Sequence, residues 1–127
     1  MITLKNDKVT VKINELGAEL KSMISGDKEY IWQADKEIWG SSCPLLFPIC
    51  GGLKDDKYIF NNREYTLPKH GYARNTMFKV EYSDSQRAVF LHSSDSETKK
   101  SFPFDYELRV IYTLNASALT IAYKVDN

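Results

Sequence analysis

The sequence predicts an all-β protein with the architecture of an antiparallel β-sandwich. Apolar residues recur at every second position along most of the chain, which is the period of a half-buried strand. The spacing of three and four residues that indicates a helix is almost absent, and turn-forming residues separate the alternating segments. The 127 residues, 43% of them hydrophobic, suffice for one buried core, so we expect a single domain over residues 1–127.

The first third of the chain contains three segments that we expect to form strands. Residues 9–13 alternate between apolar and polar side chains. A second strand is expected over residues 18–24, directly after Gly17. A third is expected over residues 29–32, after the turn-like residues 25–27.

Two β-hairpins are expected in the middle of the chain. The first joins residues 58–60 to residues 63–67 through Asn61 and Asn62, because asparagine tolerates the positive φ that a tight hairpin turn requires. The second is made of two strands and a polar turn, over residues 77–82, 87–92 and 83–86.

Two irregular segments interrupt the expected strands. Residues 40–52 contain Pro44 and Pro48, which exclude a regular central strand, although the apolar residues around them favour burial. Residues 69–75 gather polar side chains on a turn. Loops held on a rigid sheet are where binding residues tend to lie, so these two segments are the candidates for a site, whereas residues 93–101 read as an ordinary polar loop.

The clearest alternation lies at the end of the chain. Between residues 104 and 114 it predicts a long strand with one buried face, formed by Phe104, Tyr106, Leu108, Val110, Tyr112 and Leu114. After the turn-like residues 115–117, a second alternating segment is its expected hairpin partner, with Leu119, Ile121, Tyr123 and Val125 on one face. Asn127 follows directly, while this pattern is intact, so we expect the sequence to be part of a longer protein.

Composition and charge argue against several classes of partner. Seventeen basic residues balance seventeen acidic ones, so no net field attracts nucleic acid or an anionic membrane. The longest uncharged run, residues 38–53, is too short and too broken to span a bilayer. The N-terminus lacks the apolar stretch of a signal peptide, and we therefore expect a cytoplasmic protein without nucleic-acid or membrane partners.

The two cysteines, Cys43 and Cys50, have no histidine or cysteine at metal-ligand spacing, so they do not resemble a zinc site. In a reducing compartment we expect two buried thiols, with a disulfide as the alternative.

Five blocks of the sequence, taken in order, resemble the aldose 1-epimerase family, in particular its bacterial branch of LacX-like and hexose-6-phosphate epimerase-like proteins. The blocks are GAELKS (17–22), YIW (30–32), PLLFPICGGLKDDKY (44–58), YTLPKHGYAR (65–74) and FPFDYELRVIYTL (102–114). The resemblance covers nearly the whole chain.

The resemblance implies a galactose mutarotase-like fold, a large β-supersandwich of which this chain would be the N-terminal part. It implies the interconversion of aldose anomers, hexose or hexose phosphate, by ring opening and closure, with no cofactor and no metal. The histidine and the glutamate that act as general acid and general base in the family would both lie beyond residue 127. We therefore expect this fragment to be inactive.

Two residues are carried over from the family pattern. The resemblance implies that His70 faces the sugar and hydrogen-bonds its ring oxygen or a hydroxyl, in a supporting catalytic and substrate-binding role; a structural role at the turn is the alternative. Arg74 would bind a hydroxyl or a phosphate, unless it pairs with a carboxylate. One departure is that Gly52 stands where relatives usually have a substrate-binding arginine.

Four further residues or segments have a weaker case. Residues 54–57 form a mixed charge run that is typical of a solvated loop, and His92 is expected at the surface of a strand end. Trp32 and Trp39 could stack on a sugar face, with a place in the core as the alternative. Two other functions stay open: sugar binding without catalysis, and association, including a homodimer, through exposed strand edges.

Overall fold

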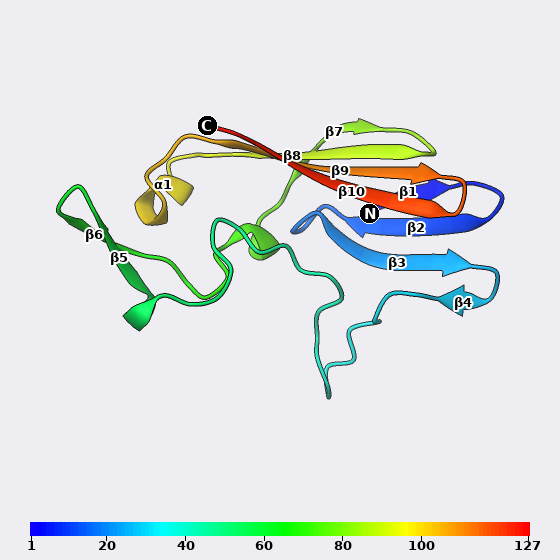
Figure 1. Ribbon diagram of the computed structural model, residues 1–127, viewed down its shortest axis with the longest axis horizontal. Helices are drawn as coiled ribbons and strands as arrows, with labels where there is room; N and C mark the ends of the chain where they lie inside the picture. Colours follow the sequence, from blue (N-terminus) through cyan, green and yellow to red (C-terminus); the bar gives the residue numbers. More distant parts are fainter.

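The computed structural model describes residues 1–127, and its regular secondary structure consists almost entirely of antiparallel strands (Figure 1), which confirms the predicted fold class. Two four-stranded sheets have the strand orders β1-β2-β3-β4 and β10-β9-β8-β7, and a separate two-stranded sheet pairs β5 with β6. The strands are β1 (Ile2–Lys5), β2 (Val9–Asn14), β3 (Glu19–Ser25), β4 (Lys28–Glu29), β5 (Lys57–Phe60), β6 (Arg63–Thr66), β7 (Lys79–Ser83), β8 (Arg87–Ser93), β9 (Glu107–Asn115) and β10 (Ala118–Asp126).

Helical structure is limited to three single turns in the connections. They are the 3-10 turns η1 (Lys54–Asp56) and η2 (Ala73–Asn75) and the α-helical turn α1 (Thr98–Ser101). The turn α1 lies inside residues 93–101, which were expected to be an ordinary polar loop. There the Asp95 carboxylate accepts hydrogen bonds from the backbone N–H groups of Glu97 and Thr98. No helix in the structure combines the length and the apolar composition that crossing a membrane requires.

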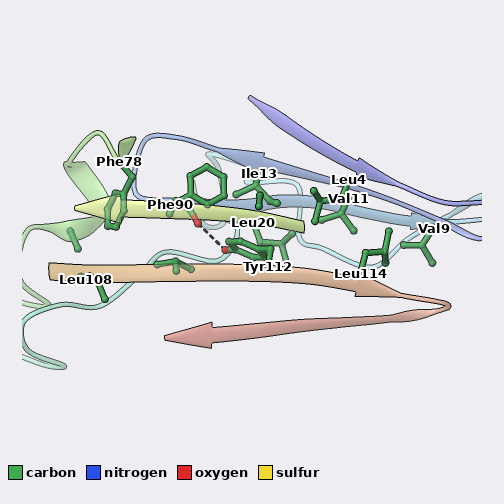
Figure 2. Packing of buried hydrophobic residues seen from close by; sticks show 14 of the residues in the cluster. Leu4, Val9, Val11, Ile13, Leu20, Phe78, Phe90, Leu108, Tyr112 and Leu114 are labelled. Atoms are coloured by element: carbon green, nitrogen blue, oxygen red, sulfur yellow. Dashed lines mark hydrogen bonds between the residues drawn. The ribbon is translucent and has the colours of Figure 1, made fainter. Parts of the chain in front are cut away.

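The core lies between the two four-stranded sheets (Figure 2). Strand β2 contributes alternate residues from one side, and β8 and β9 contribute from the other, the buried side chains being Val9, Val11, Ile13, Ala88, Phe90, Leu108, Val110, Tyr112 and Leu114. Phe90 is fully buried, and burial of such a side chain contributes about 1.5–3 kcal/mol. The Tyr112 hydroxyl donates a hydrogen bond to the Ala18 carbonyl oxygen at 2.7 Å, so this polar group is satisfied inside the core.

The C-terminal hairpin confirms the predicted alternation with one shift. Strand β9 buries Leu108, Val110, Tyr112 and Leu114, and it pairs with β10 along its whole length. It begins at Glu107 rather than at residue 104. Phe104 lies outside the strand, and the centroid of its ring is 4.8 Å from the centroid of the Phe60 ring.

Strand β10 is the edge of its sheet, and Tyr123 and Val125 on it are 58% and 49% exposed.

Both central hairpins are confirmed within two residues. The β5–β6 hairpin turns through Asn61 and Asn62, with φ of 50° and 59°, as asparagine chemistry predicts. It projects away from the two larger sheets (Figure 1). Strand β1 was not anticipated, because among its four residues only Leu4 is buried and no alternation marks it.

The strand expected over residues 29–32 ends at Glu29. The Tyr30 backbone N–H still donates to the Met23 carbonyl oxygen at 3.0 Å, but the Glu29 side chain takes the Met23 N–H that a longer strand would have paired. Its Oε1 accepts hydrogen bonds from the backbone N–H groups of Met23, Tyr30 and Ile31, each at 2.9 Å. Strand β4 therefore contains only Lys28 and Glu29. Burial alone would raise the pKa of the Glu29 carboxyl, but the Ser22 hydroxyl and these N–H groups outweigh burial and lower it.

The expected burial of the two cysteines is also wrong. Cys43 and Cys50 are exposed and free. Leu45 and Phe47 pack partly buried against the core, so the apolar residues of 40–52 contact it as expected, whereas the two thiols do not.

His92 is buried, contrary to the expectation of a surface position. It lies on β8 two residues after Phe90, and side chains two apart in a strand face the same side, so His92 faces the core. Its Nδ1 lies 2.9 Å from the Tyr106 hydroxyl, and burial lowers the pKa of the imidazole. His92 is therefore a core histidine whose surroundings favour the neutral form.

Candidate functional site

The two irregular segments identified in the sequence meet in the structure through main-chain contacts. Phe47 and Gly71 form an isolated parallel bridge. The Phe47 carbonyl oxygen accepts hydrogen bonds from the backbone N–H groups of Tyr72 at 3.0 Å and Ala73 at 3.2 Å. The peptide bond between Phe47 and Pro48 is cis. These contacts fix the residues after His70 against the proline-rich segment.

Gly71 is required at this junction by space and by backbone conformation. Its φ is +71°, a region that favours glycine. A Cβ at this position would lie 2.1 Å from the Phe47 carbonyl oxygen, which no side chain tolerates. The glycine therefore permits the close approach of the two segments, and it orients the preceding residue, His70, which has a φ of 69° itself.

His70 is held by a reciprocal pair of hydrogen bonds with Gly51. The His70 backbone N–H donates to the Gly51 carbonyl oxygen at 2.7 Å, and the Gly51 N–H donates to the imidazole Nδ1 at 2.9 Å. Because Nδ1 accepts, the neutral ring carries its proton on Nε2. Partial burial and the positive charges of Arg74 and Lys69 lower the pKa of His70, which favours this neutral form.

A pocket of about 420 Å³ brings His70 and Arg74 together. The two residues come from the segment after β6, and the rest of the wall comes from the segment after β4. The lining residues are Trp39, Ser42, Cys43, Pro44, Leu46, His70 and Arg74. Arg74 is the only charged residue in this lining, and no carboxylate contributes to it.

Arg74 has no ion pair, which removes the alternative role considered for it. None of the salt bridges in the structure involves Arg74. Its Nε is buried without a hydrogen-bond partner, as is the Ser42 hydroxyl. An unpaired buried polar group costs about 1–3 kcal/mol, so the pocket contains hydrogen-bonding capacity that the folded chain does not use.

Glu19, the first residue of β3, binds the main chain of the pocket segment that contains Ser42. Its Oε1 accepts hydrogen bonds from the backbone N–H groups of Ser42 at 2.8 Å and Cys43 at 3.0 Å. Burial alone would raise the pKa of Glu19, but these two N–H groups and Lys21 outweigh it and lower the pKa below its ordinary value. Glu19 is thus a charged anchor for a segment without secondary structure.

Gly52, the departure from the family pattern, lies beside the same turn. A Cβ built on Gly52 would be 3.7 Å from Cγ of Lys69, which is ordinary van der Waals contact. A Cβ is therefore tolerated at this position beside Lys69. In this chain the position contributes no hydrogen-bonding group to the pocket.

The tryptophans are exposed, which makes the core alternative wrong. Trp32 is 41% exposed and Trp39 51% exposed. The Trp32 indole N–H donates to the Trp39 carbonyl oxygen at 2.8 Å, and only Trp39 lines the pocket. The charge run at residues 54–57 is exposed, as expected, and does not line this pocket.

Sequence reasoning named His70 and Arg74 as site residues. Ser42 and Cys43 lie inside the candidate segment 40–52, but neither was assigned to a site, because no motif marks them. Trp39, just before that segment, was considered for stacking without a location.

A larger cleft of about 570 Å³ is a weaker candidate for a polar ligand. Its lining is mostly apolar and includes Phe47, Phe102, Phe104 and Val125. It contains neither His70 nor Arg74. The smaller pocket offers three hydrogen-bonding side chains and an exposed indole, a combination that suits a polyhydroxylated ring.

The fold and this pocket define an antiparallel β-sandwich with a small polar site built from two loops. The family model of aldose 1-epimerase matches residues 1–127, and the chain belongs to this family.

Two curated relatives carry the name protein LacX, one plasmid-encoded and one chromosomal, both from Lactococcus lactis subsp. lactis. Each is 36% identical over 132 residues, covering 99% of this chain and 44% of the relative. The chain thus spans less than half the length of these relatives.

Solved structures agree with this assignment. A galactose mutarotase-like protein from Lactobacillus casei is 37% identical with a TM-score of 0.96, and the match covers 100% of this chain and 44% of that one. A galactose mutarotase related enzyme from Lactobacillus acidophilus is 42% identical with a TM-score of 0.94, covering 97% and 42%. The predicted galactose mutarotase-like fold is therefore confirmed.

Proposed function

We propose that this chain supplies one wall of the hexose site of an aldose 1-epimerase, an enzyme that interconverts the anomers of a hexose or hexose phosphate. The observation that carries the proposal is the convergence of His70 and Arg74 on one pocket. Family membership supports the sugar as ligand.

Each polar residue has a defined role in this proposal. The bond from the Gly51 N–H leaves the Nε2–H of His70 as a donor for the ring oxygen or a hydroxyl of the sugar. The unpaired guanidinium of Arg74 donates to a second oxygen of the ligand. The exposed ring of Trp39 offers an apolar face for the C–H groups of the pyranose.

The pocket of this chain lacks the pair of groups that rapid mutarotation needs. A base must remove the proton of the anomeric hydroxyl, and an acid must protonate the ring oxygen, each contributing typically ~10²–10⁴-fold. The lining offers one imidazole and no carboxylate. We therefore expect the 127-residue chain to bind sugar without accelerating the exchange of anomers appreciably.

Binding is tested by titrating the ¹⁵N-labelled chain with D-galactose and following amide and imidazole shifts by NMR. His70→Asn is the informative variant, because asparagine tolerates positive φ and its Oδ1 can accept the Gly51 N–H, while the Nε2–H is lost. We expect weaker binding by this variant and unchanged binding by the control Lys79→Asn on β7. Saturable shifts of equal affinity in both variants would contradict the role of His70.

Catalysis is tested separately by exchange spectroscopy of the two galactose anomers. We expect the rate with the chain to stay close to the buffer rate. An exchange rate comparable with that of an intact aldose 1-epimerase would contradict the assignment of this chain as a binding wall.

A second candidate function is association through open strand edges. Strand β10 is an unpaired edge, and its apolar residues Tyr123 and Val125 are largely exposed. Pairing of β10 between two copies would cover these side chains and give a homodimer. Analytical ultracentrifugation tests this, and a monomer that persists at millimolar concentration would exclude it.

A further inference from the structure

Two polar atoms in the wall of the pocket have no role in the folded chain. Ser42 Oγ and Arg74 Nε are both buried, neither has a hydrogen-bond partner, and both residues line the same pocket. Ser42 as a whole is 9% exposed, so water has little access to it. Buried polar groups in proteins are nearly always paired, and two unpaired groups in one pocket indicate a ligand group that pairs with them.

The two atoms differ in what they can bind. The Nε–H of arginine only donates, whereas the hydroxyl of serine both donates and accepts. A ligand hydroxyl has the matching pair of functions, because its oxygen can accept from an Nε–H and its hydrogen can be donated to an Oγ. A phosphate or carboxylate oxygen accepts from both but uses only the donor capacity of Ser42.

Ser42 is held in place from outside the pocket. The Glu19 carboxylate accepts hydrogen bonds from the backbone N–H groups of Ser42 and Cys43, and its other oxygen lies 3.3 Å from Lys21 Nζ. Glu19 belongs to β3, whereas Ser42 lies in a segment without secondary structure. The position of the Ser42 hydroxyl therefore depends on a charge anchored in the sheet.

We propose that Ser42 and Arg74 bind one ring hydroxyl of a neutral hexopyranose between them, and that Glu19 is the positioning residue that fixes Ser42. This subsite belongs to the hexose pocket, so the inference rests on the proposed function. Ser42 is a specificity-determining residue in this arrangement, because only a sugar with a hydroxyl at the corresponding carbon satisfies both atoms.

The test compares D-galactose with its monodeoxy analogues on the wild-type chain and on Ser42→Ala, by NMR titration. We expect Ser42→Ala to raise the Kd for galactose about three- to tenfold, the usual range for one hydrogen bond. One monodeoxy galactose should lose similar affinity for the wild type and be insensitive to Ser42→Ala. Ser41→Ala, the neighbouring serine outside the pocket lining, is the matched control and should bind as the wild type does.

Glu19 is tested by a double-mutant cycle that separates positioning from stability. We expect Glu19→Ala to weaken galactose binding and to abolish the further effect of Ser42→Ala, because the hydroxyl is no longer fixed. Glu19→Gln keeps an acceptor for the two N–H groups and should restore part of the Ser42 effect. An undiminished Ser42 effect in the Glu19→Ala background would overturn the positioning role.

The outcomes distinguish this inference from the proposed function. If the wild-type chain binds no galactose at all, both fail. If it binds galactose and Ser42→Ala binds equally well, only the subsite fails. If Ser42→Ala weakens galactose 6-phosphate and leaves galactose unaffected, the pair binds an anion, and the assignment to a neutral hydroxyl is wrong.

Discussion

The sandwich core and the loop pocket are stabilised by different kinds of contact. In the core, many apolar side chains from both sheets share the burial, and Phe90 is fully buried among them (Figure 2). In the pocket, a few hydrogen bonds from Phe47, Gly51 and Glu19 position two segments that lack regular structure. We therefore expect core substitutions to change mainly the free energy of unfolding, and pocket substitutions to change mainly the affinity for the ligand.

The largest effect is expected from Phe90→Ala in the core. Removing a fully buried phenylalanine ring should lower the free energy of unfolding by about 3–5 kcal/mol, measured by urea denaturation. Phe60→Ala removes the same ring from a position that is 37% exposed and should cost much less. Equal unfolding midpoints for the two variants would contradict the claim that the buried ring of Phe90 contributes more stability than the partly exposed ring of Phe60.

A smaller but still large effect is expected from Gly71→Ala at the junction of the two loops. The added Cβ would clash with the Phe47 carbonyl oxygen at a positive φ, so we expect a loss of about 2–4 kcal/mol and of galactose binding. Gly26→Ala is the control, with a φ of +58° but nothing within 4 Å, and should cost about 1 kcal/mol. If the two variants are equally stable, the close approach to Phe47 does not hold the pocket together.

Gly52→Arg should change affinity with little change in stability. A Cβ fits at this position, and the family resemblance implies a sugar-binding arginine there. We therefore expect the added guanidinium to make galactose bind about tenfold more tightly. Gly52→Met, which adds volume without charge, controls for packing. A gain by the methionine variant equal to that by arginine would show that hydrogen bonding is not the cause.

The smallest effect is expected from the titration of His92 in the core. Burial lowers the pKa of His92 in the folded state, so the unfolded state binds the proton more readily. The contribution to stability is complete above the unfolded pKa of about 6.5 and is lost as the pH falls from there toward the folded pKa. Unfolding midpoints at about pH 7.5 and about pH 5.5 should therefore differ.

Two variants separate this effect from that of the pocket histidine. His92→Phe removes the titrating group and should flatten the pH dependence, whereas His70→Asn should leave most of it. Carboxylates with lowered pKa values, such as Glu19 and Glu29, lose their contribution only at lower pH, below about 4.5. An unchanged slope in His92→Phe would assign the pH dependence to another group.

The regular part of the fold could be predicted because its information is local. Alternation along β2 and β9 reports directly which face is buried. The same alternation, applied strictly, would have placed His92 with Phe90 on the core side. The strand expected over residues 29–32 stops at Glu29, because the Glu29 carboxylate accepts the Met23 N–H that the next residue of a longer strand would have paired.

The pocket could be predicted only in part because it depends on contacts between distant segments. His70 and Arg74 lie on one turn, and the resemblance to the family identified both. Ser42 and Trp39 join them only because Phe47 meets Gly71 and Glu19 meets Ser42, and neither contact leaves a periodic signal in the sequence.

The hydrogen bond from Tyr112 to Ala18 has a dynamic consequence. Ala18 precedes Glu19, so the residue that accepts from the core tyrosine is covalently joined to the residue that anchors Ser42. Ordering of Ser42 by a ligand should therefore reduce local opening at the start of β3. Slower amide hydrogen–deuterium exchange in β3 and in the paired β2, at residues that touch no sugar, is the expected signature.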